Sequence, residues 1–310
     1  MYALDGGGPR SRAAAYRYLL RLSRRGVQVA AVYAWRLDIL AWAADLCRSE
    51  GFQVALVAQL GHNNGYAETL VMQGHADSKP TTLDVFHVGY SFDQASRTHA
   101  YCPNYDGPLW WAALGLLARQ VQLIKPDVVV IDTEVWEPPD FVEQNLPGLI
   151  AACPRCGTVE RYNAGWLAKA NDIRAILDGC APGIPVLYYG ACRTPPPPIG
   201  KRYVHPGWPH TFDADPCLAL YSCNKMPDPI ATLAEALKVT PVKGGHPWLT
   251  PWVEWSKPER GFLPPAVLRK QAAMMRAEGA AGIQLWPGPR AEGDTEHDDA
   301  LWAAVAAIGA

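Results

Sequence analysis

Residues 126–136 read Pro-Asp-Val-Val-Val-Ile-Asp-Thr-Glu-Val-Trp, an apolar run that ends in two acids with one residue between them. A short β-branched run of this kind is typical of a strand that is buried on both faces, as in the parallel sheet of an α/β protein. Successive strand side chains point to opposite faces, so Asp132 and Glu134 are predicted to share one face. Both acids stand at the carboxyl end of the strand, where α/β barrels carry their chemistry.

The alternative is that Asp132 and Glu134 are solvated loop residues just past the strand. Ionised side chains are rarely buried unless they are paired or functional, which favours a functional role for two acids beside a buried strand.

The alternation of short apolar runs with longer helical patterns continues from Val27 to the C-terminus and predicts repeated β-α units. Eight strands are predicted, at residues 27–34, 52–58, 83–90, 127–134, 184–190, 217–221, 249–253 and 281–286. Helices are predicted between them at residues 36–50, 109–124, 164–177, 229–237 and 264–278. We therefore predict an α/β protein with one (β/α)8, TIM-like barrel domain over residues 26–310, preceded by a basic helical extension in residues 1–25. A doubly wound sheet is the alternative, but neither Gly-x-Gly-x-x-Gly nor a P-loop occurs.

Composition narrows the classes of partner. A chain of 310 residues with 49% hydrophobic content can bury a large core, and its length suits one barrel. The net charge is -2 and the pI is about 6.4, without a basic stripe, so nucleic acid is not expected as a partner. No apolar stretch is long enough for a membrane span, and residues 1–8 lack the pattern of a signal peptide. We expect a protein without a membrane partner that is cytoplasmic as encoded; secretion and the oligomeric state stay open.

The eight cysteines are too sparse for a disulfide scaffold in a chain of this length. Cys153-Pro-Arg-Cys156 has the spacing of half a zinc site, but no second Cys-x-x-Cys and no His pair follows at a usual distance. A structural zinc site needs four ligands, so we expect no metal at Cys153 and Cys156. We also expect no cofactor for the protein as a whole.

Aromatic side chains gather at the predicted strand ends, together with amides such as Gln59 and Gln284. Sugars present apolar C–H faces edged by hydroxyls, so a carbohydrate cleft combines flat aromatic platforms with carboxylates and amides. The predicted substrate-binding residues are Tyr90, Trp136, Tyr221, Trp252, Glu254 and Trp286. For Trp136 and Trp286 we favour the cleft over core packing, because barrel active sites lie at strand ends.

Glycoside hydrolysis needs a carboxylic acid that protonates the leaving oxygen and a second group that stabilises or captures the oxocarbenium-like centre. In one version Glu134 is the acid, a substrate N-acetyl group is the nucleophile, and Asp132 orients that amide. In a second version Glu254 is the nucleophile, which for retention requires a separation of about 5 to 5.5 Å from Glu134. Glu254 can equally be a solvated rim charge near Lys257 and Arg260.

Four motifs occur in the order and approximate spacing of one enzyme family, over residues 125–290. They are Ile-Asp-Thr-Glu-Val-Trp-Glu-Pro at 131–138, Tyr-Tyr-Gly at 188–190, Ala-Leu-Tyr at 219–221 and Gly-Ala-Ala-Gly-Ile-Gln-Leu-Trp at 279–286. Together they resemble the hyaluronidase-type glycoside hydrolases, whose barrels carry an Ile-Asp-x-Glu-x-Trp-x-Pro motif. The resemblance implies that Glu134 is the acid/base, that Asp132 positions the substrate acetamido group, and that Tyr189 and Trp286 make further contacts with it. The predicted catalytic residues are thus Glu134, Asp132 and Tyr189.

The sequence departs from this family at two positions near the predicted site. Thr133 stands where an aromatic residue is usual, and Lys225 stands near the position of a second tyrosine that helps to hold the acetamido group. Lysozyme-like and chitinase-like barrels also use a closely spaced Asp and Glu. The resemblance therefore leaves hyaluronan, peptidoglycan and chitin-type substrates open.

We accordingly predict a retaining glycoside hydrolase that cleaves an N-acetylhexosamine-containing glycan by substrate assistance, without a cofactor. Two other classes stay open. One is a non-catalytic carbohydrate-binding barrel, since a fold does not imply an activity. The other is a metal-dependent barrel enzyme in which Asp132, Glu134 and a histidine such as His62 or His87 are ligands.

Overall fold

In the part of the chain that this computed structural model describes, seven strands form one sheet. The structure describes residues 12–33, 37–60, 101–132, 136, 139, 142–143, 146–191, 215–219, 224, 227–239, 242–253, 261–285 and 298–309. The strands are β1 (Val29–Val32), β2 (Gln53–Ala58), β3 (Val128–Asp132), β4 (Val186–Ala191), β5 (Asp215–Ala219), β6 (Trp248–Leu249) and β7 (Gln284–Leu285). Each strand pairs in parallel with the next one in sequence order. These strands correspond to seven of the eight predicted ones.

The remaining predicted strand, at residues 83–90, lies outside the described residues. β2 pairs directly with β3, with Ala55 opposite Val128 and Ala58 opposite Ile131. In the described part of the chain, β2 therefore has β1 along one edge and β3 along the other.

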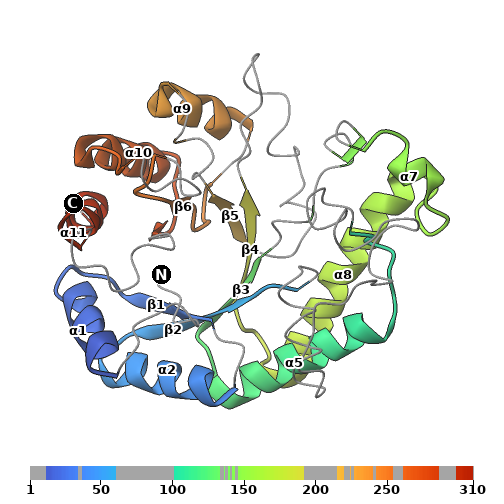
Figure 1. Cartoon of the computed structure of the whole chain (residues 1–310), viewed down its shortest axis with the longest axis horizontal. Coiled ribbons are helices and arrows are strands. Elements are labelled where there is room, and N and C mark those ends of the chain that lie inside the picture. The colour runs from blue at the N-terminus through green and yellow to red at the C-terminus, as the bar shows by residue number, and fades with distance from the viewer. Residues whose placement is uncertain are drawn as a thin grey trace.

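The helices lie outside the strands and form a ring around them (Figure 1). They are α1 (Arg12–Ser23), α2 (Leu37–Ser49), α5 (Pro108–Ile124), α7 (Leu149–Ala152), α8 (Val159–Cys180), α9 (Pro229–Val239), α10 (Pro265–Ala277) and α11 (Asp298–Gly309). No helix in the described part of the chain is both long and apolar enough to cross a bilayer. A parallel sheet in sequence order with an outer helical layer is the (β/α)8-barrel architecture that the sequence predicts.

Side chains of β3 alternate between two apolar layers. Val129 and Ile131 belong to the large cluster between the strands and the surrounding helices. Val130 belongs to a smaller cluster that also holds Ala31, Tyr33, Ala55, Val57, Leu187 and Trp248, the inward-facing residues of neighbouring strands. Burial on both faces explains why the run is uniformly apolar, as in other parallel sheets.

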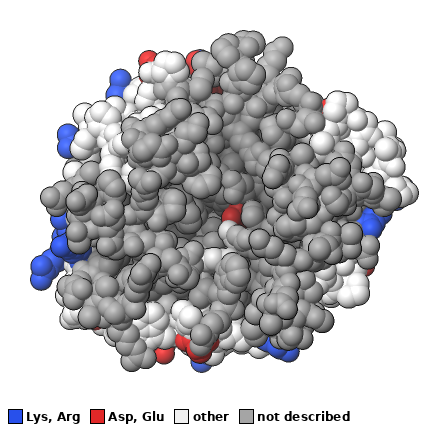
Figure 2. Space-filling model, viewed as in Figure 1, with Lys and Arg blue, Asp and Glu red and all other residues white. Residues whose placement is uncertain are grey.

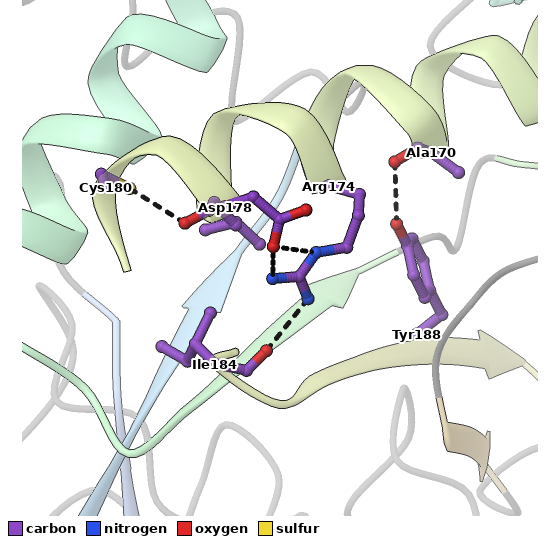
Figure 3. Close-up of polar contacts among 7 residues, drawn as sticks. Ala170, Arg174, Asp178, Cys180, Ile184 and Tyr188 are labelled. Carbon is purple, nitrogen blue, oxygen red and sulfur yellow. Dashed lines mark hydrogen bonds and ion pairs between the residues drawn. The ribbon is translucent and has the colours of Figure 1, made fainter. Parts of the chain in front are cut away.

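Polar contacts tie α8 to β4 (Figure 3). The hydroxyl of Tyr188 donates to the carbonyl oxygen of Ala170 over 3.4 Å, and Arg174 Nη1 donates to the carbonyl oxygen of Ile184 over 3.0 Å. The helix begins at Val159 rather than at the predicted residue 164, because the Thr158 side chain caps it by accepting from the Arg161 backbone N–H.

The N-terminal helix α1 packs on the barrel rather than standing apart from it. Leu19 and Leu22 are buried in the same cluster as the outer face of the sheet. Arg21 and Arg25 place their guanidinium groups over the ring of Trp302 in α11, at 5.7 and 4.8 Å from its centroid. The first and last helices are thus neighbours, as Figure 1 also shows, and the helical ring closes between them.

Gly165 allows the segment before α5 to lie against α8. A Cβ atom at this position would stand 2.8 Å from Asn104 Oδ1 and 2.9 Å from the carbonyl carbon of Pro103. We expect Gly165→Ala to lower the free energy of unfolding by about 1 to 3 kcal/mol, because backbone has to move to relieve the clash. Urea unfolding followed by circular dichroism measures this change.

Gly179 is the matched control, since it lies in the same helix and a Cβ atom there would meet nothing within 4 Å. Gly179→Ala is expected to raise stability by up to about 1 kcal/mol through helix propensity alone. Equal effects of the two substitutions would show that residues 103–104 do not approach α8 this closely.

Candidate active site

Asp132 is the last residue of β3 and lies at the carboxyl edge of the parallel sheet. Its position follows Val128 and Val130, which pack with the interior cluster, so alternation directs its carboxylate to the barrel interior. The residue is 8% exposed. A carboxylate this buried needs polar partners, because leaving a buried charge without hydrogen bonds is costly.

Two neighbouring strands supply such partners. Gln59 follows β2, and its Nε2 atom donates to Asp132 Oδ2 over 3.2 Å. Tyr33 follows β1, and its hydroxyl donates to Gln59 Oε1 over 3.0 Å. The three side chains form a chain of hydrogen bonds along the carboxyl ends of β1, β2 and β3. Such a chain restricts the rotamers of both Gln59 and Asp132.

Neither Tyr33 nor Gln59 is among the residues that the sequence predicts for the site, although Gln59 stands at a predicted strand end. No pattern in the sequence identifies these residues as a group, because their proximity follows from the register of the sheet. Ala58 pairs with Ile131, so the next residues of the two strands, Gln59 and Asp132, come to lie side by side.

Tyr189 is the backbone partner of Asp132 on the other side, because β3 and β4 pair in parallel with these two residues opposite each other. The sheet therefore brings two of the three predicted catalytic positions next to each other. The side chain of Tyr189 lies outside the described part of the structure.

The remaining predicted site residues also lie outside the described residues. They are Glu134, Tyr90, Tyr221, Glu254 and Trp286, and the same holds for His62 and His87 of the metal-dependent alternative. Their roles stay predictions.

Trp136 lies in the core rather than at an open strand end, contrary to the prediction that it binds substrate. Its ring is 2% exposed and stacks on Trp166 of α8, with ring centroids 4.8 Å apart and an interplanar angle of 18°. The ring of Tyr188 lies 6.0 Å away on the same outer side of the sheet. A sugar platform needs an accessible face, so Trp136 acts here as packing between the segment after β3 and α8.

Trp252 is corrected in the same way. It is 0% exposed and stacks on Phe262, with centroids 4.1 Å apart. The two residues also form an isolated antiparallel bridge, which ties the segment after β6 to the approach of α10. A ring this deeply packed offers no surface for a glycan.

Charged side chains of both signs appear among the described residues on one face of the molecule. In the space-filling view, Lys, Arg, Asp and Glu all occur around the periphery, and one acidic group is visible near the centre (Figure 2). This arrangement agrees with the absence of a basic stripe in the sequence.

Possible metal ligands gather elsewhere. Cys102, Cys153 and Cys156 are buried together, with their sulfur atoms within 4.8 Å of one another. Within the described residues this is the only group of three potential ligands, and Asp132 does not belong to it. The expectation that Cys153 and Cys156 lack further ligands is wrong, because Cys102 supplies a third thiol.

Comparisons with known proteins define the fold. No protein-family model matches the chain, and no curated protein matches its sequence. Among solved structures, it is similar to a β-galactosidase from Bacillus circulans sp. alkalophilus, with a TM-score of 0.61 and 12% identity over 99% of this chain and 54% of that chain. It is also similar to α-L-fucosidase isoenzyme 2 from Paenibacillus thiaminolyticus, with a TM-score of 0.54 and 13% identity over 96% of this chain and 45% of that one.

A third similar structure is a chitobiase from Flavobacterium johnsoniae, with a TM-score of 0.52 and 10% identity over 99% of this chain and 47% of that chain. The chain spans about half the length of these three structures. They confirm the predicted fold class, a (β/α)8 barrel of the kind found in glycosidases. Identities this low establish the fold alone.

The contact between Gln59 and Asp132 makes a prediction for stability. We expect Gln59→Leu to lower the free energy of unfolding by about 1 to 3 kcal/mol, because a buried carboxylate loses a donor. Gln53→Leu is the control, since Gln53 is exposed at the start of the same strand and should change stability by less than about 0.5 kcal/mol. Indistinguishable urea midpoints for the two variants would contradict the contact.

Proposed function

We propose that the protein is a retaining glycoside hydrolase that cleaves an N-acetylhexosamine-containing glycan by substrate assistance. The observation that carries the proposal is the placement of Asp132, whose carboxylate lies at the carboxyl edge of the sheet and is held by Gln59. The barrel fold, which the chain shares with several glycosidases, supports it. So does the Asp-x-Glu spacing in the sequence of Asp132, the last residue of β3, and Glu134.

In the first step of this mechanism, protonated Glu134 gives its proton to the glycosidic oxygen as the bond from that oxygen to the anomeric carbon breaks. The carbonyl oxygen of the substrate acetamido group attacks the same carbon and forms a cyclic oxazolinium. Asp132 accepts a hydrogen bond from the acetamido N–H and stabilises the positive charge that develops there. Gln59 and Tyr33 act as positioning residues, because they hold the carboxylate of Asp132 in one orientation.

In the second step, Glu134 takes a proton from a water molecule, which attacks the anomeric carbon from the face that the leaving group vacated. The oxazolinium reopens to the acetamide, and the product keeps the configuration of the substrate. The protein thereby uses one carboxyl group as acid and then as base, while the nucleophile belongs to the substrate.

Substitution of the two acids tests the proposed roles on chitin-type, hyaluronan and peptidoglycan glycans, with release of reducing ends as the readout. Glu134→Gln is expected to lower kcat by about 10² to 10⁴ fold on these poor leaving groups, because the general acid is lost. Asp132→Asn should lower turnover strongly as well. Asp127→Asn is the matched control, since Asp127 lies at the opposite end of β3 and accepts from the Val54 backbone N–H. Full activity of Glu134→Gln would remove the basis of the proposal.

Glu254 distinguishes substrate assistance from the two-carboxylate route. If the acetamido oxygen is the nucleophile, Glu254→Gln should have little effect, and a thiazoline analogue of the cyclic intermediate should inhibit strongly. Successive fluorination of the substrate acetyl group should lower kcat/KM stepwise, because fluorine weakens the carbonyl oxygen as a nucleophile. Loss of activity in Glu254→Gln with no fluorine dependence would assign the nucleophile to Glu254 instead.

A further inference from the structure

Three thiols from two distant parts of the chain meet in the core beside α5 and α8. Cys102 Sγ lies 3.9 Å from Cys153 Sγ and 3.7 Å from Cys156 Sγ. All three residues are at most 2% exposed. Two sulfur atoms that share one tetrahedral zinc ion at Zn–S distances of about 2.3 Å lie about 3.8 Å apart. The two distances from Cys102 match the separation of ligands around one zinc ion, and Cys153 Sγ lies within 4.8 Å of Cys156 Sγ.

We propose that Cys102, Cys153 and Cys156 bind a structural zinc ion through their three thiolates. Binding converts each thiol to a thiolate, so three protons pass to solvent as three Zn–S bonds form, without any change of oxidation state. Thiolates are soft ligands, and the Cys-x-x-Cys spacing of residues 153–156 is typical of zinc sites. The fourth position would be taken by a water molecule, because Asn104 directs its Nδ2 toward Cys156 and its Oδ1 toward Gly165.

The backbone of the 153–157 turn is shaped to present two cysteines on one side. The backbone N–H groups of Cys156 and Gly157 both donate to the carbonyl oxygen of Cys153, over 3.1 and 2.8 Å. Gly157 has φ +69°, in the left-handed region that glycine adopts most readily. The turn is thus closed by its own hydrogen bonds.

Neighbouring polar groups suit a cluster that carries negative charge. Asn104 Nδ2 lies 3.3 Å from Cys156 Sγ and can donate to a thiolate there, as outer-shell groups do at metal sites. Zinc with three thiolates carries a net charge of minus one, and the nearby ammonium of Lys169 can balance it. Lys169 is 3% exposed, and its Nζ donates to the carbonyl oxygen of Tyr105 over 2.8 Å. Burial lowers the pKa of Lys169 to about 8, while Asp172, Cys102 and Asp106 act in the opposite direction.

The site would fasten two connections at the carboxyl edge of the sheet. Cys102 precedes α5, which leads to β3, and the Cys153–Cys156 turn precedes α8, which leads to β4. These two helices lie side by side (Figure 1). The role is structural and independent of the proposed glycosidase activity.

Zinc content and cobalt substitution test the proposal on the full chain. Protein purified without chelator should contain about one zinc ion per chain by inductively coupled plasma mass spectrometry. After chelation under reducing conditions, Co²⁺ should produce thiolate-to-cobalt charge transfer in the near ultraviolet and the visible bands of a tetrahedral site. Removal of the metal should lower the Tm, and added zinc should restore it.

Single cysteine variants assign the ligands. Cys102→Ala and Cys156→Ala should lose the cobalt bands and the zinc dependence of the Tm. Cys47→Ala should keep both, because Cys47 is equally buried but lies in α2, apart from the three thiols. If a ligand variant fails to fold, X-ray absorption at the zinc edge of the unmodified protein still counts sulfur neighbours, with three expected at about 2.3 Å.

Several results would overturn the proposal. One is that the unmodified protein binds neither zinc nor Co²⁺, and another is that Cys102→Ala retains the cobalt bands. The third such result is that the purified protein contains copper or iron in place of zinc. A disulfide from Cys102 to either partner, found in protein alkylated at the moment of lysis, would do the same. In each case the three residues would be packed thiols or a redox pair rather than zinc ligands.

Discussion

Burial of β3 on both of its faces is the constraint from which the candidate site follows. Val129 and Ile131 fill the space below the helices, and Val130 fills the barrel interior, so no polar side chain is tolerated before the strand ends. After this apolar run, Asp132 is the first residue that can carry a charge. Its carboxylate accepts a hydrogen bond from the amide of Gln59, which follows the neighbouring strand β2. A carboxylate at this depth is held in place by the same packing that isolates it.

Local sequence patterns predicted most of the strands and helices, because the pattern of apolar residues in each element reflects which of its faces are buried. They failed where a feature depends on how far a strand extends. The alternation rule assigns Asp132 to the interior, but β3 ends there, and the rule no longer governs Trp136 four positions later. The ring of Trp136 instead lies against Trp166 in α8. Position at a strand end therefore says little about which face an aromatic ring takes once the strand is over.

Contacts between distant segments were the other part that the sequence could not reveal. Gln59 meets Asp132 because β2 and β3 are neighbours in the sheet, although the two residues are 73 positions apart in the sequence. Cys102 likewise joins Cys153 and Cys156 across about fifty residues, because α5 and α8 pack together. Neither contact can be predicted from a spacing in the sequence. The Cys-x-x-Cys turn is local, so the sequence did indicate it as half of a zinc site.

The hydrogen-bonded residues around Asp132 and the three thiols both lie at the carboxyl edge of the sheet. Both restrict the movement of segments at that edge. The carboxylate of Asp132, in its proposed catalytic role, must keep one orientation. The hydrogen bonds from Tyr33 to Gln59 and from Gln59 to Asp132 restrict that orientation. The segment after β3 must also be held from outside, and Trp136 does this by stacking on α8. α8 is itself fixed to β4 through Tyr188 and Arg174. A displacement of α8 would therefore also displace the segment after β3. The proposed zinc ion would fix the start of α8 and in this way contribute to the rigidity of the sheet edge at Asp132.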